Sequence, residues 1–396
     1  MRGHKSPVAK EASVPFGLVG CDFRVASSRW RSAVVLGREE RARLSEKLRQ
    51  SRVVESVVFL DTCNRNEWIY AAADPCWAGE ILKTQMVKRW QQMGAPVPRP
   101  YVLVADVAVR HVLRVAAGLE SFVVGERQIT TQFNRAVERA RREGVSSAVL
   151  NSLGSVAARV ARDVHETASP GCGLHGVHDV AARYLGRVLK APATIAVVGC
   201  GEIGRRVSEA LQQIPGFKVL MINRTARKGA HPLSDLPGIK AEAVVACTAA
   251  SSPIVTPANL PGGPLILVDL GIPSQIERGC AARPGTQRVD LDDLLRSEEL
   301  DLVAPEKLRA ASDLVESGVR DFVHICLRRR FVSILDRTRQ NHEDFVAKVL
   351  PRFIDEFACR SDAAARGQME YRLRGIFRQY TNSLFRSIND SIGQED

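Results

Sequence analysis

The sequence predicts a multidomain α/β protein with a ferredoxin-like N-terminal domain, a Rossmann-type domain and a C-terminal helical domain. Residues 16 to about 105 alternate strand and helix patterns in split βαβ order. A glycine-rich stretch, Gly199 to Gly204, directly follows a short apolar run. From about Pro305 onward the chain is charged, with apolar residues at helical spacing. The expected domains are residues 1–168, 169–304 and 305–396.

Length and composition indicate the number of domains, the cellular location and the kind of partner to expect. The 396 residues, 45% of them hydrophobic, suffice for two or three domain cores. No apolar run approaches the ~18 residues that span a bilayer, and the N-terminus lacks the apolar stretch of a signal peptide, so we expect a cytoplasmic protein without membrane association. The nine cysteines show no CxxC pair, which predicts separate thiols and no metal site. The formal charge of +12 favours a polyanionic partner, here RNA and not DNA, although basic surfaces also occur in proteins that bind neither.

The N-terminal pattern contains six recognisable elements in order. A strand starts near Phe16, and charged residues from Arg38 to Arg49 suit a helix. Two strands flank Cys63, and a helix near Ile81 to Trp90 leads to a last strand at Tyr101 to Val104. This order predicts the ferredoxin-like sheet.

The turn at Cys63 carries the strongest chemical signal in the chain. The apolar run Val57 to Leu60 ends there, and strand alternation resumes at Glu67 to Tyr70. An exposed thiol beside Arg65 can act as a nucleophile, because the permanent cation either favours the thiolate or captures a substrate carboxylate. The alternative interpretation is a small apolar residue at a strand end next to a solvated arginine.

Two helices are expected after this domain core. The first contains His111 and ends at Gly118. The second runs from about Glu126 to Glu143, ends at Gly144, and carries Gln128 and Gln132 on one flank. Its predicted buried stripe consists of Ile129, Phe133, Val137 and Ala140.

The middle of the chain predicts a dinucleotide site. The apolar strand Thr194 to Val198 runs into the glycine-rich stretch and a helix, which is the context that the fingerprint requires. The glycines let a pyrophosphate approach a helix N-terminus. The next strand, Lys218 to Ile222, ends without an acidic residue, which favours NADPH over NADH. Further strands are expected at Val244 to Ala246 and Leu265 to Asp269, and the alternative is a Rossmann-like domain that binds nothing. The predicted cofactor-binding residues are Gly199, Cys200, Gly201, Glu202, Ile203, Gly204, Asn223, Arg224 and Thr225.

The C-terminal region is expected to form long helices that cannot bury their apolar stripe alone, which predicts a homodimer through these helices. Arg328-Arg329-Arg330 is interpreted either as an RNA contact or as a solvated helix face. The predicted stripe consists of Leu308, Leu314, Val315, Val346, Leu350, Phe353, Ile354 and Phe357.

Thr62-Cys63-Asn64-Arg65, His111 and the segment Gly118 to Gln132 together resemble the glutamyl-tRNA reductase family over nearly the whole chain. That family joins a nucleophilic cysteine in a TCNR turn to a GL(D/E)S...GE.QI...Q segment, followed by a nucleotide-binding domain and a helical tail. The resemblance implies that Cys63 attacks the ester between glutamate and the tRNA 3′ end. The resulting thioester is reduced by NADPH to glutamate-1-semialdehyde, the first step of five-carbon tetrapyrrole (porphyrin and haem) synthesis.

The resemblance also implies roles for individual residues and partners. Arg65 would hold the glutamate carboxylate, with Thr62 and Asn64 donating or accepting hydrogen bonds around it. His111 would orient or deprotonate a reacting group. The implied partners are glutamyl-tRNA, a second copy of the chain and, as a candidate, glutamate-1-semialdehyde aminomutase. The family's substrate-contacting positions correspond here to Ser121, Glu126, Arg127, Gln128 and Gln132.

Several positions depart from the family pattern. Asp61 and Asn66 flank the turn where serine and threonine are usual, and a carboxylate at Asp61 would raise the pKa of the thiol. Arg127 replaces a proline at a helix start, and Ser274 replaces an arginine after the strand that ends at Asp269. The segment Asp22 to Ser27 keeps little of the NHKTAP pattern, Arg31 keeps its place, and the helix after Thr225 is much shortened.

Three hypotheses remain open. The first is a divergent active reductase. The second is a catalytically impaired paralogue that binds tRNA or a partner protein in a regulatory role, against which stand Cys63, Arg65, His111 and the three fingerprint glycines. The third, an unrelated NADP-dependent dehydrogenase, leaves the TCNR turn unexplained.

Overall fold

The computed structural model divides the chain into two compact units, Met1–Phe322 and Val323–Asp396. The domain boundaries expected after residues 168 and 304 adjoin segments outside the described residues, and they stay predictions. The described residues are 14–94, 97–168, 176–225, 227–248, 250, 252–297, 304–357 and 363–393.

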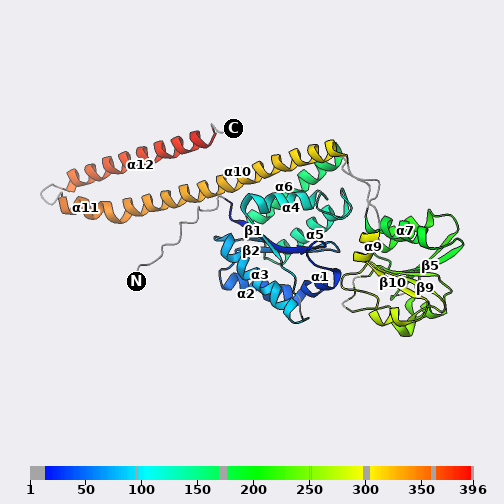
Figure 1. Cartoon of the computed structure of the whole chain (residues 1–396). Helices are drawn as coiled ribbons and strands as arrows, with labels where there is room; N and C mark the ends of the chain where they lie inside the picture. The colour runs from blue at the N-terminus through cyan, green and yellow to red at the C-terminus, as the bar shows by residue number, and fades with distance from the viewer. Residues whose placement is uncertain are drawn as a thin grey trace, which may run out of the picture. The chain divides into compact units, whose positions relative to one another are not determined.

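The N-terminal domain is built on a four-stranded antiparallel sheet with strand order β2-β3-β1-β4. Figure 1 labels its strands β1 and β2. This order confirms the ferredoxin-like prediction. In chain order, its elements are β1 (Phe16–Asp22), α1 (Ser28–Val34), α2 (Arg38–Gln50), β2 (Ser56–Asp61), β3 (Arg65–Ala71), α3 (Pro75–Gln91) and β4 (Tyr101–Val104).

Helices cover both faces of this sheet, which explains why every residue of β1 and β3 is buried. On one face Trp68 and Tyr70 pack against Leu82, Met86 and Trp90 of α3. The other face carries three further helices (Figure 1), of which the third was not anticipated from the sequence. They are α4 (Ala105–Ala116), α5 (Gln128–Arg142) and α6 (Ala148–Asp163), and a π-helical turn, Val164–Ala168, follows α6.

The α5 helix buries a stripe that differs from the prediction at one position. Ala136 is buried and Val137 is only half-buried, because the stripe follows a 3-4 spacing from Phe133. The positive φ of Gly144 ends this segment as expected.

The second domain holds a six-stranded parallel sheet with strand order β10-β9-β8-β5-β6-β7, the Rossmann arrangement. The strand order reverses between β5 and β8, and in sheets of this kind dinucleotides bind at the carboxyl ends of the strands beside such a point. The shortened helix is a 3-10 turn, Leu233–Gly238. The main elements are α7 (Val177–Val188), β5 (Ala193–Val198), α8 (Glu202–Gln212), β6 (Phe217–Asn223), β7 (His231–Pro232), β8 (Ala243–Ala246), β9 (Leu265–Asp269), β10 (Thr286–Asp290) and α9 (Leu291–Ser297).

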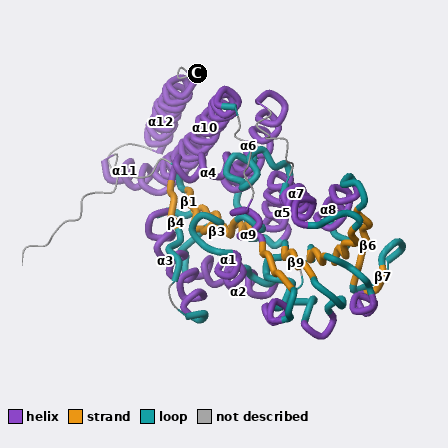
Figure 2. Tube along the Cα trace, turned by 45° about the vertical axis from the view of Figure 1, so that its right-hand side comes forward, coloured by secondary structure: helices purple, strands orange, loops and turns teal. Residues whose placement is uncertain are grey.

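The last region is helical throughout its described residues (Figure 2). On the first part of α10 (Pro305–Asp344), the buried stripe is Ala311, Val315, Val319 and Phe322. The predicted Leu308 lies on the same helix face, one turn before Ala311, but is 38% exposed. No described helix is long and apolar enough to cross a bilayer.

In the second compact unit, a helical hairpin buries part of the predicted stripe within the chain. Leu350 and Ile354 of α11 (Leu350–Phe357) pack against Leu373 and Phe377 of α12 (Ala363–Gly393). A π-helical turn, Phe345–Val349, precedes α11. The side chains of Val346, Phe353 and Phe357 lie outside the described part of the structure.

Candidate active site

The turn that carries Cys63 is fixed by its own threonine. The Oγ1 atom of Thr62 accepts hydrogen bonds from the backbone N–H groups of Asn64 and Arg65, at 3.2 and 3.1 Å. The Thr62 N–H donates to the Arg65 carbonyl at 2.9 Å. Thr62 is itself buried, so its hydroxyl shapes the turn that presents the sulfur.

Cys63 is half-buried, whereas the sequence predicted an exposed thiol. It packs against the core of the Rossmann-type domain, a cluster that includes Val197 and Val268. Burial raises the pKa of the Cys63 thiol to about 12; Glu126 adds to this rise, while Arg31 and Arg65 oppose it. The sulfur is therefore a neutral thiol at neutral pH in this state.

The carboxylate that opposes ionisation of Cys63 is Glu126, not the Asp61 predicted from its sequence neighbourhood. Asp61 accepts a hydrogen bond from Asn66 Nδ2 at 2.9 Å, which ties it to the strand pair. Glu126 is almost fully buried, and burial raises the pKa of its carboxyl to about 7, against the lowering effect of Arg206 and Arg65.

Arg65 is fully buried and already bonded on two of its nitrogens. One Nη donates to Glu67 Oε1 at 3.1 Å, and the other donates to the backbone carbonyl of Glu120. Its Nε has no hydrogen-bond partner. The arginine thus ties the turn to the loop after α4 and keeps one N–H available.

Glu67 contacts several polar side chains around Arg65, and the sequence pattern did not identify it as a site residue. Its Oε1 also accepts from the Tyr101 hydroxyl at 2.6 Å and lies 2.6 Å from His111 Nε2. Burial alone would raise the pKa of Glu67, but His111 and Arg65 outweigh it and hold that pKa well below its ordinary value. The available signal was its position two residues after Arg65, which puts both side chains on one face of β3.

The loop between α4 and α5 folds back on itself. Gly118 has a positive φ, and its carbonyl accepts the Gly125 N–H at 3.0 Å. The Glu120 carboxylate bridges Arg114 Nε at 2.6 Å and an Nη of Arg24 at 2.8 Å. These bonds fix the loop that carries the predicted substrate contacts.

Several predicted substrate contacts are buried, and some lack partners. Ser121 and Gln128 are buried, although without the family pattern they would be expected in solvent-exposed loop and helix. Arg127 is exposed at the start of α5, and Gln132 is half-buried one turn further on. Buried polar atoms without partners call for an explanation such as a missing ligand. Those in the turn, β3, the loop and the start of α5 are Asn64 Oδ1, Arg65 Nε, Asn66 Oδ1, Glu67 Oε2, Trp68 Nε1, Ser121 Oγ and Gln128 Nε2.

The glycine-rich stretch has the geometry of a dinucleotide cradle. Gly199 follows β5 with a φ of +117°, and a Cβ on Gly204 would lie 1.8 Å from the Gly199 carbonyl oxygen. A Cβ on Gly201 would meet nothing within 4 Å, which leaves open space at the N-terminus of α8, where Glu202 and Ile203 form the first turn. These residues fit a pyrophosphate at a helix start.

The end of β6 is polar and lacks a carboxylate. Asn223 Nδ2 donates to the Thr225 carbonyl at 2.7 Å, and Arg224 and Thr225 are exposed. The buried Cys200 offers its carbonyl to Arg227 Nη1 at 3.0 Å. Two exposed donors therefore stand where a ribose would lie.

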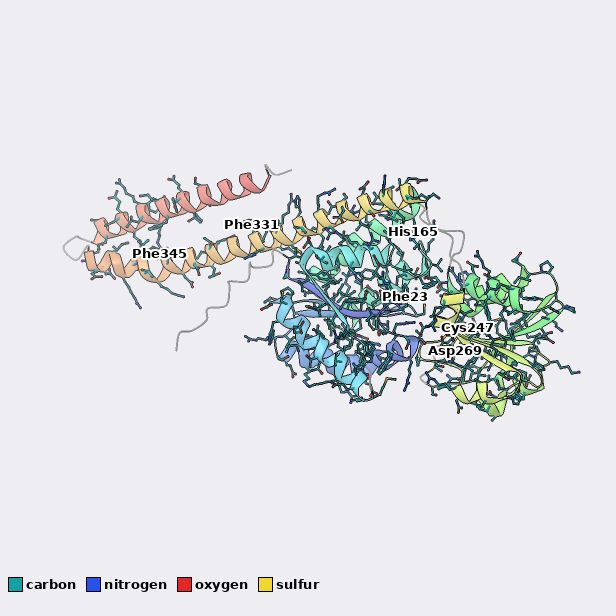
Figure 3. The ribbon with its side chains drawn as sticks, viewed as in Figure 1. Phe23, His165, Cys247, Asp269, Phe331 and Phe345 are labelled. Carbon is teal, nitrogen blue, oxygen red and sulfur yellow. The ribbon has the colours of Figure 1, made fainter. Side chains whose placement is uncertain are left out.

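Asp269, at the end of β9 and labelled in Figure 3, fixes the following loop. It accepts from Ser274 Oγ at 2.6 Å, from Arg288 Nη2 at 3.1 Å and from three backbone N–H groups. Arg288 also donates to Ser274 Oγ at 3.0 Å. A guanidinium from β10 thus stands beside Ser274, the position where the family pattern has an arginine.

Arg31 connects the two domains of the first unit. It is fully buried and donates to the Ala26 carbonyl at 2.6 Å and to Asp292 of α9 at 3.0 Å. The Ser28 N–H donates to the same carboxylate. The start of α1 is therefore bonded directly to the Rossmann-type domain.

A ferredoxin-like domain with a cysteine turn, joined to a Rossmann-type domain with an intact glycine fingerprint, is an architecture that suits an oxidoreductase of the nicotinamide-dinucleotide class. Residues 19–168 match the family described as glutamyl-tRNAGlu reductase, N-terminal domain, and residues 180–297 match shikimate / quinate 5-dehydrogenase. In its N-terminal domain the chain is therefore similar to the glutamyl-tRNA reductases.

Individual relatives show the degree of divergence. The glutamyl-tRNA reductase of Geobacillus kaustophilus is 28% identical over 333 residues, covering 77% of this chain and 72% of the relative. That of an Exiguobacterium species is 24% identical over 410 residues, covering 96% and 90%. Among solved structures, the glutamyl-tRNA reductase from Methanopyrus kandleri is 20% identical with a TM-score of 0.45, covering 96% of this chain and all of that one.

Proposed function

We propose that this protein reduces glutamyl-tRNA to glutamate-1-semialdehyde with NADPH, through a thioester on Cys63, as the first step of five-carbon tetrapyrrole synthesis. One observation carries the proposal. The Cys63 turn packs against the core of the nucleotide-binding domain and adjoins buried polar atoms that lack partners. An acyl acceptor and a hydride donor would therefore meet at one place.

The unpartnered atoms suit an amino acid. Glutamate presents an ammonium group and a side-chain carboxylate. Asn64 Oδ1 and Glu67 Oε2 are acceptors that suit the ammonium group, while Arg65 Nε and Gln128 Nε2 are donors that suit the carboxylate. Ser121 Oγ can serve either group.

The acyl transfer step needs a proton to move. The Cys63 sulfur forms a bond to the ester carbonyl carbon as the bond to the ribose oxygen breaks, and the thiol proton ends on that leaving oxygen. Glu126, with a pKa of about 7, can accept and return a proton near neutral pH. Glu67 fixes the imidazole of His111 by their 2.6 Å contact, which makes His111 the second candidate for this transfer.

The nucleotide-binding domain would supply the reductant. NADPH, when bound, would supply the hydride that converts the thioester to the aldehyde and releases the Cys63 sulfur as a thiolate, which then takes up a proton. Residues 199–204 would hold its pyrophosphate, and Asn223, Arg224 and Thr225 would accept its 2′-phosphate. We further propose a cytoplasmic homodimer whose residues 1–168, 169–304 and 305–396 serve catalysis, NADP binding and dimerisation.

A trapping experiment tests the proposal. Purified full chain and glutamyl-tRNA without NADPH should give a hydroxylamine-sensitive thioester, and adding NADPH should convert it to the semialdehyde. Cys63→Ser should abolish the thioester, whereas Cys76→Ser, at an exposed thiol, should not. Equal semialdehyde from Cys63→Ala would reject the mechanism.

The second candidate is a non-catalytic paralogue that binds tRNA or a partner protein such as the aminomutase. The raised pKa of Cys63 favours it, because a neutral thiol is a poor nucleophile. Tight binding of glutamyl-tRNA without any thioester, at pH 7 to 9, would select this candidate.

A further inference from the structure

We propose that residues Phe23 to Ser27, in the segment that departs from the family pattern, form with Phe122 and α9 a pocket for the 3′-terminal nucleoside of the acylated RNA. This inference rests on the proposed function and adds a binding site for the leaving group. The pocket has a volume of about 240 Å³. That is below the ~300 Å³ at which drug-sized pockets begin, so it suits a single nucleobase rather than a longer stretch of RNA.

The pocket presents flat surfaces. The rings of Phe23 and Phe122 meet edge to face, with centroids 5.1 Å apart. The Arg24 guanidinium lies over the Phe23 ring, 5.4 Å from its centroid, and is 52% exposed. Unpaired bases in RNA are commonly held by stacking on aromatic rings and on arginine planes.

The Arg24 plane is held in place. Its Nε donates to Asp22 Oδ2 at 2.8 Å, and an Nη donates to Glu120 Oε2 at 2.8 Å. Asp22 also accepts the Arg24 backbone N–H at 2.9 Å. A long side chain that is already ordered loses less conformational entropy when a base stacks on it.

The pocket adjoins the nucleophile. The Phe23 N–H donates to the carbonyl of Asn64, the residue after Cys63, at 2.9 Å. Phe122 and Cys63 pack against the same apolar cluster. The leaving oxygen of the ester belongs to the terminal ribose, so the nucleoside must lie beside the sulfur during attack.

The charges of the pocket favour an uncharged ligand. Asp292 is neutralised by Arg31, Arg296 is paired with Asp293 at 2.8 Å, and Arg24 is paired with two carboxylates. Because both arginines of this pocket are already paired with carboxylates, they would attract a phosphate only weakly. A neutral base does not need an unpaired cation to bind.

The position separates this pocket from the dinucleotide crevice. Asp292 and Arg296 lie on α9, directly after β10 at the edge of the sheet. In the strand order β10-β9-β8-β5, the point of reversal between β8 and β5 is two to three strand spacings from β10, or roughly 10–14 Å. The two ligands would therefore occupy separate places.

A fluorescent RNA end tests the pocket by binding. Full-chain Cys63→Ala protein is titrated with glutamyl-tRNA that carries 2-aminopurine as its 3′-terminal base, whose emission falls on stacking. We expect quenching, and in Phe23→Leu and Phe122→Leu versions of the same protein about fivefold or weaker binding with the quenching lost. Trp77→Leu, at an exposed aromatic on α3, should bind as the parent does.

A second experiment distinguishes failure of the pocket proposal from failure of the proposed function. With Cys63 intact, Phe122→Leu should slow acylation by glutamyl-tRNA about fivefold but leave acylation by the ethyl α-ester of glutamate unchanged. If the parent is acylated and quenches normally but the leucine variants match it, the pocket is wrong and the proposed function stands. If neither ester acylates the parent, both proposals fail. Equal slowing with both esters would mean a structural role for Phe122 and would also overturn the pocket.

Discussion

At the residue scale, the protonation of Cys63 is set by its three-dimensional surroundings. Because the thiolate reacts with alkylating agents and the thiol does not, a pKa of about 12 predicts slow alkylation at pH 7. Iodoacetamide modification of Cys63, followed by peptide mass spectrometry, should accelerate about tenfold per pH unit from pH 7 to 10. The exposed Cys76 in the same sample provides the internal reference.

Removing the nearby carboxylate should change this rate in a defined direction. Glu126→Gln deletes a negative charge that raises the Cys63 pKa, so alkylation should become several-fold faster at pH 9. Near pH 6 the difference should shrink, because a carboxyl with a pKa of about 7 is mostly neutral there. Identical rates at pH 9 would show that Glu126 does not act on the sulfur.

Glu67 should matter for stability. Glu67→Gln leaves the buried Arg65 without its charged partner, and we expect a loss of about 3–5 kcal/mol in the free energy of unfolding by urea. Glu80→Gln, at an exposed ion pair with Lys83, should change it by less than about 1 kcal/mol.

The pH dependence of this contribution has a definite sign. The folded-state pKa of Glu67 is lowered, so its contribution is complete above the unfolded value of about 4.3 and declines as pH falls below it. The urea midpoint of the parent should therefore fall more steeply between pH 5 and 3 than that of Glu67→Gln. Parallel curves for the two proteins would contradict this account.

At the element scale, two glycines in the turn between β5 and α8 allow the effects of substitution on folding and on dinucleotide binding to be measured separately. Gly204→Ala places a methyl group against the Gly199 carbonyl oxygen and should destabilise the protein by about 1–3 kcal/mol. Gly201→Ala meets no atom within 4 Å, so it should keep the melting temperature while filling the space that a pyrophosphate would use. Thermal melts together with NADPH fluorescence titration would measure both. Undiminished NADPH binding by a folded Gly201→Ala protein would place the dinucleotide elsewhere.

In the loop after β9, the arginine that the family pattern has at Ser274 is replaced by an arginine from a neighbouring strand. The sequence pattern points to an arginine missing at Ser274, while the structure has Arg288 of β10 donating to both Ser274 and Asp269. Parallel strands bring residues far apart in sequence to one sheet edge, so a cation can come from either strand. Reading one motif in isolation cannot reveal such an exchange.

At the scale of the whole molecule, oligomerisation is the open prediction. Met369, Ile376 and Tyr380 of α12 are 41%, 61% and 68% exposed, at a spacing that aligns them on one helix face. Light scattering should give a dimer for the full chain, and Ile376→Glu should shift it towards monomer. Tyr371→Glu, on a different face of α12, serves as the control. A monomeric parent at micromolar concentration would reject dimerisation.

The sequence by itself determined the fold class, the order of the strands and the presence of a cysteine turn and a glycine fingerprint. These features depend on local periodicity and on glycines at φ values that other residues avoid. Both can be recognised from the order of residues in the sequence. The tertiary structure alone decided which groups surround them. Glu67 meets His111, Glu126 acts on Cys63 in place of Asp61, and Arg288 stands beside Ser274 because strand pairing and loop closure join distant residues. Burial, and hence the pKa of each group, follows from that packing, since desolvation depends on what lies around a side chain in space.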